Sequence, residues 1–104
     1  MTYNIIISDR AAIMLESHIA FLQQKSDIAA KNLRRKIISD IRSLETTPAR
    51  YPFFNEQYIP ANRYHKMVIE NRYLVLYQIK DGTVFVDWVI DGRQDYQWLF
   101  RRFN

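Results

Sequence analysis

The chain of 104 residues has no cysteine, only two glycines and no long apolar run. Without cysteine it cannot form a disulfide scaffold, a thiolate zinc site, an Fe–S cluster or a cysteine nucleophile. Its apolar stretches fall far short of the roughly 20 residues that span a bilayer, and the N-terminus lacks the basic and apolar regions of a signal peptide. We therefore expect a cytoplasmic protein without a membrane-spanning helix.

Several catalytic and binding motifs are also missing. Gly82 and Gly92 are ten residues apart, so the sequence contains neither a GxGxxG nor a Walker phosphate loop. There is no Gly-x-Ser-x-Gly motif, and the serines fall at expected helix caps or on helices. His18 and His65 have no metal-ligand spacing such as HExxH. No metal and no cofactor are predicted.

The charge is moderately basic, with 15 Lys and Arg against 11 Asp and Glu, a formal net charge of +4 and a pI of about 9.5. Such values suit an anionic partner, but many ordinary domains share them. The charge divides equally between the two halves of the chain, and no polybasic tail exists. A nucleic-acid surface would therefore have to be assembled by folding from several elements.

The first half of the chain predicts a strand over residues 3–8 and two helices. Ser8 or Asp9 can cap a helix that runs to about Gln24, and Ser26 and Asp27 can cap a second that runs to about Glu45. The short connection makes the helices antiparallel. Apolar residues recur at helical spacing on one face of each helix: Ala12, Leu15, Ile19 and Leu22, then Ala30, Leu33, Ile37, Ile41 and Leu44.

All three prolines fall within residues 47–62, so this segment is irregular, although its aromatic residues predict an ordered loop packed on the domain. Three β-rich runs follow at residues 64–70, 72–79 and 84–90, with a strong hairpin signal at Asp81-Gly82. An amphipathic segment over residues 94–103 ends the chain. We predict an α+β fold in the order β-α-α-β-β-β-α, with a twisted antiparallel sheet of about four strands, an N-terminal helical hairpin and a C-terminal helix.

Basic residues, tyrosine and one histidine gather on the predicted C-terminal sheet, a set that suits phosphodiester chemistry. When a ribose 2′-OH attacks the adjacent phosphate, fixed cations stabilise the developing charge and a histidine or tyrosine can move protons. Alternation places His65 and Lys66 on opposite faces, so they cannot both point at one ligand unless the strand twists or bulges. The alternative is a solvated sheet face with a half-buried histidine. The residues concerned are Arg63, His65, Lys66, Arg72, Arg93 and Tyr96.

The predicted second helix has a basic stripe opposite its apolar face. Such a stripe could follow a phosphate backbone, or it could be an ordinary solvated face balanced by Asp27 and Asp40. Its members are Lys31, Arg34, Arg35, Lys36 and Arg42.

The C-terminal stretch RYLVLYQI, its Asp-Gly turn and the run VFVDWVIDGRQDY resemble the C-terminal half of the RelE/ParE toxin superfamily. The order of elements and the segment IAAKNL at the start of the second helix are similar too, so the resemblance covers nearly the whole chain as one domain, residues 1–104. It implies the toxin of a bacterial type II toxin–antitoxin or plasmid stabilisation pair. A small antitoxin would cover its exposed aromatic residues.

The superfamily resemblance leaves two targets open. RelE-like members cut mRNA in the ribosomal A site without a metal, whereas ParE-like members poison DNA gyrase. Arg93 matches the motif arginine, Tyr96 matches the aromatic residue after it, and Arg72 is a looser match. Many members carry a histidine where this chain has Asp91, and a carboxylate there is repelled by phosphate and titrates too low for a general base.

We favour mRNA cleavage as the sequence-based expectation, since the inventory of cations, tyrosine and histidine suits RNA. The expected catalytic residues are Arg93, Tyr96, Arg72, His65 and Lys66. Gyrase poisoning is the alternative, and a degenerate, non-toxic binding module is a second one. For Arg93 itself, transition-state stabilisation competes with a structural ion pair to Asp91 or Asp95.

Overall fold

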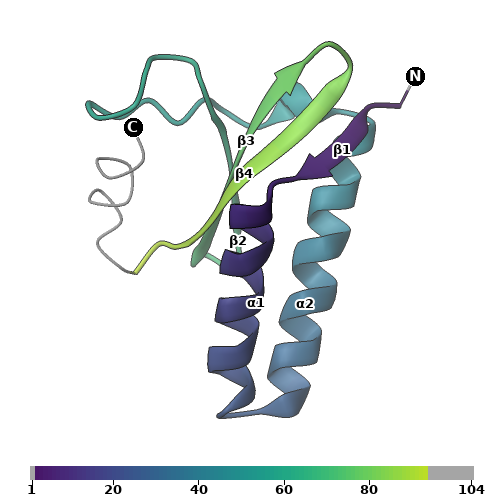
Figure 1. The fold of residues 1–104 in the computed structure, drawn as a ribbon, viewed down its shortest axis with the longest axis vertical. Helices are drawn as coiled ribbons and strands as arrows, with labels where there is room; N and C mark the ends of the chain where they lie inside the picture. The colour runs from purple at the N-terminus through teal and green to yellow at the C-terminus, as the bar shows by residue number, and fades with distance from the viewer. Residues whose placement is uncertain (1, 94–104) are drawn as a thin grey trace.

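The computed structural model describes residues 2–93, which form two α-helices and a four-stranded open sheet (Figure 1). The elements are β1 (Asn4–Ile7), α1 (Asp9–Gln23), α2 (Asp27–Arg42), β2 (His65–Ile69), β3 (Tyr73–Lys80) and β4 (Thr83–Asp91), with short 3-10 helices at Ser43–Glu45 and Pro48–Arg50. The α+β class and the order of these elements are confirmed. The predicted C-terminal helix, which includes Tyr96, lies outside the described residues.

Both helices begin at the predicted serine caps. The Ser8 hydroxyl accepts a hydrogen bond from the Ala11 N–H, and the Ser26 hydroxyl accepts one from the Ala29 N–H. Each cap satisfies a backbone donor that the first helical turn leaves without a partner. The helices lie antiparallel and side by side, and the tip of their hairpin extends away from the sheet (Figure 1).

The sheet order is β1-β4-β3-β2, and its direction corrects one prediction. The strands β2, β3 and β4 pair antiparallel through two tight turns, as expected, but β1 pairs parallel to β4. The sheet is therefore mixed and not purely antiparallel. A register shift at Leu76/Tyr77 lies in the middle of the β3–β4 ladder.

The two faces of the sheet are covered differently. The apolar stripe of α2 is buried as predicted, and it joins α1 residues and one face of the sheet in the larger core. In α1, Leu15 and Ile19 are buried as predicted, but the stripe begins with Ala11, and Ala12 is exposed. On the opposite face Phe54 and Ile59 pack on Leu76 and Trp88, so the proline-containing segment is ordered and packed against the sheet, as predicted.

Candidate functional site

Two arginines predicted from the sequence meet at the end of the sheet. Arg72 directly precedes β3, and Arg93 lies two residues after Asp91, the last residue of β4. Gly92 brings these segments together, because its N–H donates to the Arg72 carbonyl at 2.7 Å. A Cβ at residue 92 would lie 2.8 Å from that carbonyl oxygen, so the close approach requires glycine.

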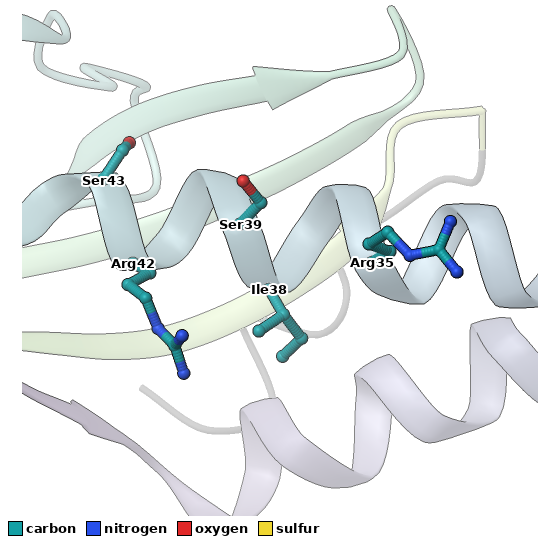
Figure 2. Close-up of a pocket in the computed structure, with 5 residues that line it drawn as sticks. All are labelled: Arg35, Ile38, Ser39, Arg42 and Ser43. Atoms are coloured by element: carbon teal, nitrogen blue, oxygen red, sulfur yellow. The ribbon is translucent and has the colours of Figure 1, made fainter.

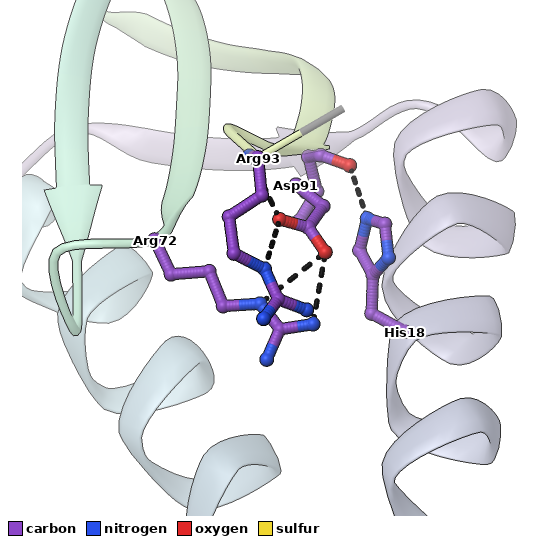
Figure 3. A network of polar contacts seen from close by, with 5 residues as sticks. His18, Arg72, Asp91 and Arg93 are labelled. Atoms are coloured by element: carbon purple, nitrogen blue, oxygen red, sulfur yellow. Dashed lines mark hydrogen bonds and ion pairs between the residues drawn. The ribbon is translucent and has the colours of Figure 1, made fainter. Parts of the chain in front are cut away.

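The carboxylate of Asp91 contacts both arginines (Figure 3). Nη2 and Nε of Arg72 donate to Oδ2 at 2.9 and 3.2 Å. The other oxygen, Oδ1, accepts from the Arg93 N–H at 3.0 Å and lies 3.5 Å from Arg93 Nε. We call Arg72, Asp91 and Arg93 the Asp91 cluster.

The electrostatics of the Asp91 cluster follow from burial and hydrogen bonding. Burial alone would raise the pKa of Asp91, but the hydrogen bonds from Arg72 and from the Arg93 N–H outweigh it and lower that pKa below its ordinary value. The hydrogen bond to Asp91 in turn raises the pKa of Arg72. The cluster therefore holds two cations and one anion near neutral pH, a net charge of +1.

The arginines of the cluster are not equivalent. The Arg72 side chain is 24% exposed and is fixed by two hydrogen bonds, whereas the Arg93 side chain is 63% exposed. Arg93 is thus the member of the cluster that can reach a ligand in solvent. The ion pair of Arg93 with Asp91 is the structural alternative that the sequence analysis raised.

A shallow depression of about 430 Å³ lies beside Arg72, between the helical hairpin and the β2–β3 turn. Asn32, Glu70 and Tyr73 contribute polar groups to its wall. Burial raises the pKa of Tyr73, so its hydroxyl stays protonated near neutral pH. The neighbouring His18 donates from Nε2 to the Val89 carbonyl at 2.9 Å, which holds its ring beside the cluster (Figure 3).

The structure separates His65 from the Asp91 cluster. His65 is buried, and its ring is stacked between those of Phe53 and Tyr77, with distances between ring centres of 4.2 and 5.2 Å. Its Nδ1 donates to the Tyr51 carbonyl at 2.8 Å. It pairs with Tyr77, four residues along β3 from Tyr73, which is a separation of about 13 Å along the strand. The interpretation of His65 as a buried strand histidine fits this environment.

Lys66 and Tyr96 complete the predicted set. Lys66 is on the opposite sheet face from His65, as alternation predicted, and its Nζ lies 5.4 Å from the centre of the Phe54 ring. Tyr96 lies outside the described residues. Of the five predicted catalytic residues, the structure therefore brings Arg72 and Arg93 together and leaves His65 and Lys66 apart from them.

Sequence reasoning missed the bond between Arg72 and Asp91, although a signal for it exists. In a hairpin that turns at Asp81-Gly82, Lys80 pairs with Thr83. If the same register continued along both strands away from the turn, Arg72 would pair with Asp91. The register shift moves the partner of Asp91 to Tyr73, but Arg72 stays within reach. For His18 the metal-ligand spacing was considered, but its position beside the cluster was likewise missed.

Two absences hold for the part of the chain that the structure describes. Within residues 2–93, no group of three His, Asp or Glu side chains gathers in a way that could hold a metal ion. Over the same residues, neither helix is both long enough and apolar enough to cross a membrane.

The fold of two helices and a four-stranded sheet recurs among solved protein structures. A solved structure described as "Chromosomal ParDE TA system from P. aeruginosa" superposes with a TM-score of 0.70 at 10% identity, covering 86% of this chain and 95% of that chain. None of the curated proteins compared with the chain matches it. The sequence model of the family described as "ParE toxin of type II toxin-antitoxin system, parDE" matches residues 5–96, and the chain belongs to this family.

Proposed function

We propose that this protein is a growth-inhibiting toxin that acts on DNA gyrase, and that a cognate antitoxin neutralises it. The family supports the toxin role, because its description names the ParDE type of toxin–antitoxin pair. The gyrase target, the alternative of the sequence analysis, replaces mRNA cleavage as the preferred action. The observation that carries this change is the Asp91 cluster.

The cluster is poorly suited to cleaving RNA. A phosphate that approaches Arg72 meets the ionised carboxylate of Asp91. This carboxylate already accepts hydrogen bonds from Nε and Nη2 of Arg72. Metal-independent cleavage also needs groups that move protons beside the cations. Both histidines of the chain are held by backbone carbonyls. His18 lies beside the cluster and donates from Nε2 to the Val89 carbonyl, whereas His65 lies apart from it, stacked between two aromatic rings, and donates from Nδ1 to the Tyr51 carbonyl.

The test begins with purified gyrase and negatively supercoiled plasmid. We expect the toxin to produce linear DNA, released by detergent and protease, only when gyrase is present. In cells, induction should stop growth and activate an SOS reporter, and co-expression of the small protein encoded beside the toxin should restore growth. Intact plasmid together with a silent SOS reporter would overturn the gyrase assignment.

Cleavage of ribosome-bound mRNA remains the second candidate because Arg93 is exposed and precedes Tyr96. Mapping mRNA 5′ ends after induction tests it directly, since cuts at codon positions would favour cleavage. In that case Arg93→Ala should reduce cutting by about a hundredfold at an unchanged Tm. Full-length protein that arrests nothing would favour the degenerate binding module.

A further inference from the structure

The cations of α2 are not uniformly neutralised by neighbouring acids. Arg34 pairs with Glu16 of α1, and Lys36 pairs with Asp40 one turn away. The other three cations of the helix, Lys31, Arg35 and Arg42, are exposed and form no ion pair with any residue in the range 2–93. Neighbouring acids therefore balance two of the five basic residues and leave these three without an ion pair in the described part of the chain.

The three unpaired cations lie on one line of the helix. With Ile38 they recur at intervals of four, three and four residues, which keeps them on one face of an α-helix. We call Lys31, Arg35, Ile38 and Arg42 the α2 stripe. From Lys31 to Arg42 it extends about 16 Å along the helix axis.

The surface around the stripe is shallow and open. Arg35 and Arg42 line a depression of about 450 Å³ together with Ile38, Ser39 and Ser43 (Figure 2). Guanidinium groups at both ends of a short hollow suit phosphate oxygens, which they bind through a planar fork of donors. Asp40 is the acid of α2 that is nearest in sequence to these arginines. It lies on roughly the opposite side of the helix from them and pairs with Lys36.

The charge of the chain is concentrated on this helix. α2 has five basic residues and two acidic ones, so it carries a net charge of +3 out of +4 for the whole sequence. A rigid helix with a line of free cations presents a local positive field to a polyanion. No aromatic side chain occurs in α2 on which an unpaired base could stack, and stacking is the main means of binding single-stranded RNA.

We propose that the α2 stripe binds the phosphate backbone of duplex DNA without regard to sequence. Lys31, Arg35 and Arg42 each contact a phosphate and release its counterions, which makes binding strongly salt-dependent. This inference goes beyond the gyrase proposal, since α2 alone carries it and it can be measured without gyrase. Such a contact would keep the toxin close to duplex DNA, which is the substrate of the proposed target, gyrase.

The test compares two triple variants of the full chain. Lys31→Gln/Arg35→Gln/Arg42→Gln removes the stripe, while Lys25→Gln/Arg63→Gln/Lys80→Gln removes the same charge from exposed positions outside α2. Fluorescence anisotropy with a labelled duplex of about 20 base pairs is measured between about 50 and 200 mM salt. Thermal unfolding of both variants checks that they fold as the unchanged chain does.

We expect the stripe variant to bind the duplex at least about tenfold more weakly, with a salt slope reduced by about 2 to 3. The control variant should keep most of its affinity and slope. Equal losses in the two variants, or no duplex binding by the unchanged chain, would overturn the proposal. So would a larger effect of the stripe on a single-stranded RNA or on polyglutamate. A negative result here leaves the gyrase assay unaffected, because gyrase is absent from this experiment.

Discussion

Arg72 precedes β3 and Arg93 follows β4, so both lie at the open end of the β3–β4 hairpin and share the carboxylate of Asp91, whose side chain is only 7% exposed. A carboxylate this deeply buried depends on its donors, because burial disfavours its charged form. Arg72 supplies two of these donors through its side chain. Arg93 supplies one through its backbone N–H, which any residue at that position except proline would retain.

This difference predicts unequal effects of alanine substitution. Arg72→Ala should lower the free energy of unfolding by about 2 kcal/mol, since it leaves a buried carboxylate poorly compensated. Arg93→Ala should cost at most about 0.5 kcal/mol, because it removes only a long and exposed ion pair. Urea unfolding measures both, with Arg72→Lys as a control that keeps the charge but loses the two-donor geometry. A larger loss for Arg93→Ala would contradict the assignment of roles.

The lowered pKa of Asp91 predicts how stability depends on pH. A carboxylate with a lower pKa in the folded than in the unfolded state contributes stability above the unfolded value of about 4, and this contribution disappears as the pH falls through the folded value. Asp91→Asn should therefore flatten the loss of stability in acid relative to the unchanged protein. The Tm of both proteins, measured at a series of pH values from neutral into the acid range, tests this expectation.

Glu16→Gln is the matched control for this pH series. The hydrogen bond from Arg34 also lowers the pKa of Glu16, but that pair is exposed to solvent. Its removal should change the acid dependence much less than Asp91→Asn does. Equal effects of the two substitutions would show that burial of Asp91 adds nothing.

The residue-scale predictions from the sequence succeeded where a local rule applied. Alternation correctly separated His65 from Lys66, and nearness in sequence correctly suggested an ion pair between Arg93 and Asp91. The stacking of His65 could not be predicted, because Tyr51 and Phe53 reach it from an irregular loop whose path no periodicity describes.

At the scale of elements, the two tight turns of the sheet differ in how well their residues suit them. Asp81 and Gly82 have φ values of 52° and 74°, and Glu70 and Asn71 have 56° and 52°. Left-handed backbone is readily adopted by glycine, asparagine and aspartate, but not by glutamate. The β2–β3 turn therefore contains one poorly suited residue.

Glu70→Asn should raise the free energy of unfolding by about 0.5 to 1 kcal/mol, since asparagine tolerates the left-handed conformation better. The midpoint of urea unfolding measures the gain. Glu70→Gln removes the same charge without this conformational preference and should give no gain. An equal increase in both variants would attribute the effect to the charge of Glu70 beside Arg72.

The direction of β1 shows where local reasoning ends. Short turns fix the direction of the strands they join, and the two-residue turn at Asp81-Gly82 also fixes a register, so β2, β3 and β4 could be predicted as an antiparallel set. No turn connects β1 to β4, and two helices and an irregular segment separate them. Their parallel pairing is set by how the helices pack on the sheet, which the residues of β1 do not encode locally.

At the scale of the whole molecule, the net charge of each half of the sequence does not reveal that most of the positive charge lies on α2. Each half has a net charge of +2, which led us to expect any nucleic-acid surface to combine several elements. Within residues 2–93 the structure instead leaves three cations of α2 without an ion pair, because Glu16 and Asp40 neutralise the other two. The Lys36–Asp40 pair lies within α2, but the Arg34–Glu16 pair depends on the packing of α1 against α2.

The parallel pairing of the first and last described strands also has a consequence for synthesis. Ser8, just after β1, donates to the carbonyl of Asp87 in β4, which is 79 residues further along the chain. At about 5 to 20 residues per second, a ribosome needs several seconds to supply the partner of β1. Until then the nascent chain has no complete sheet. The sheet is thus completed only after β4 has been synthesised.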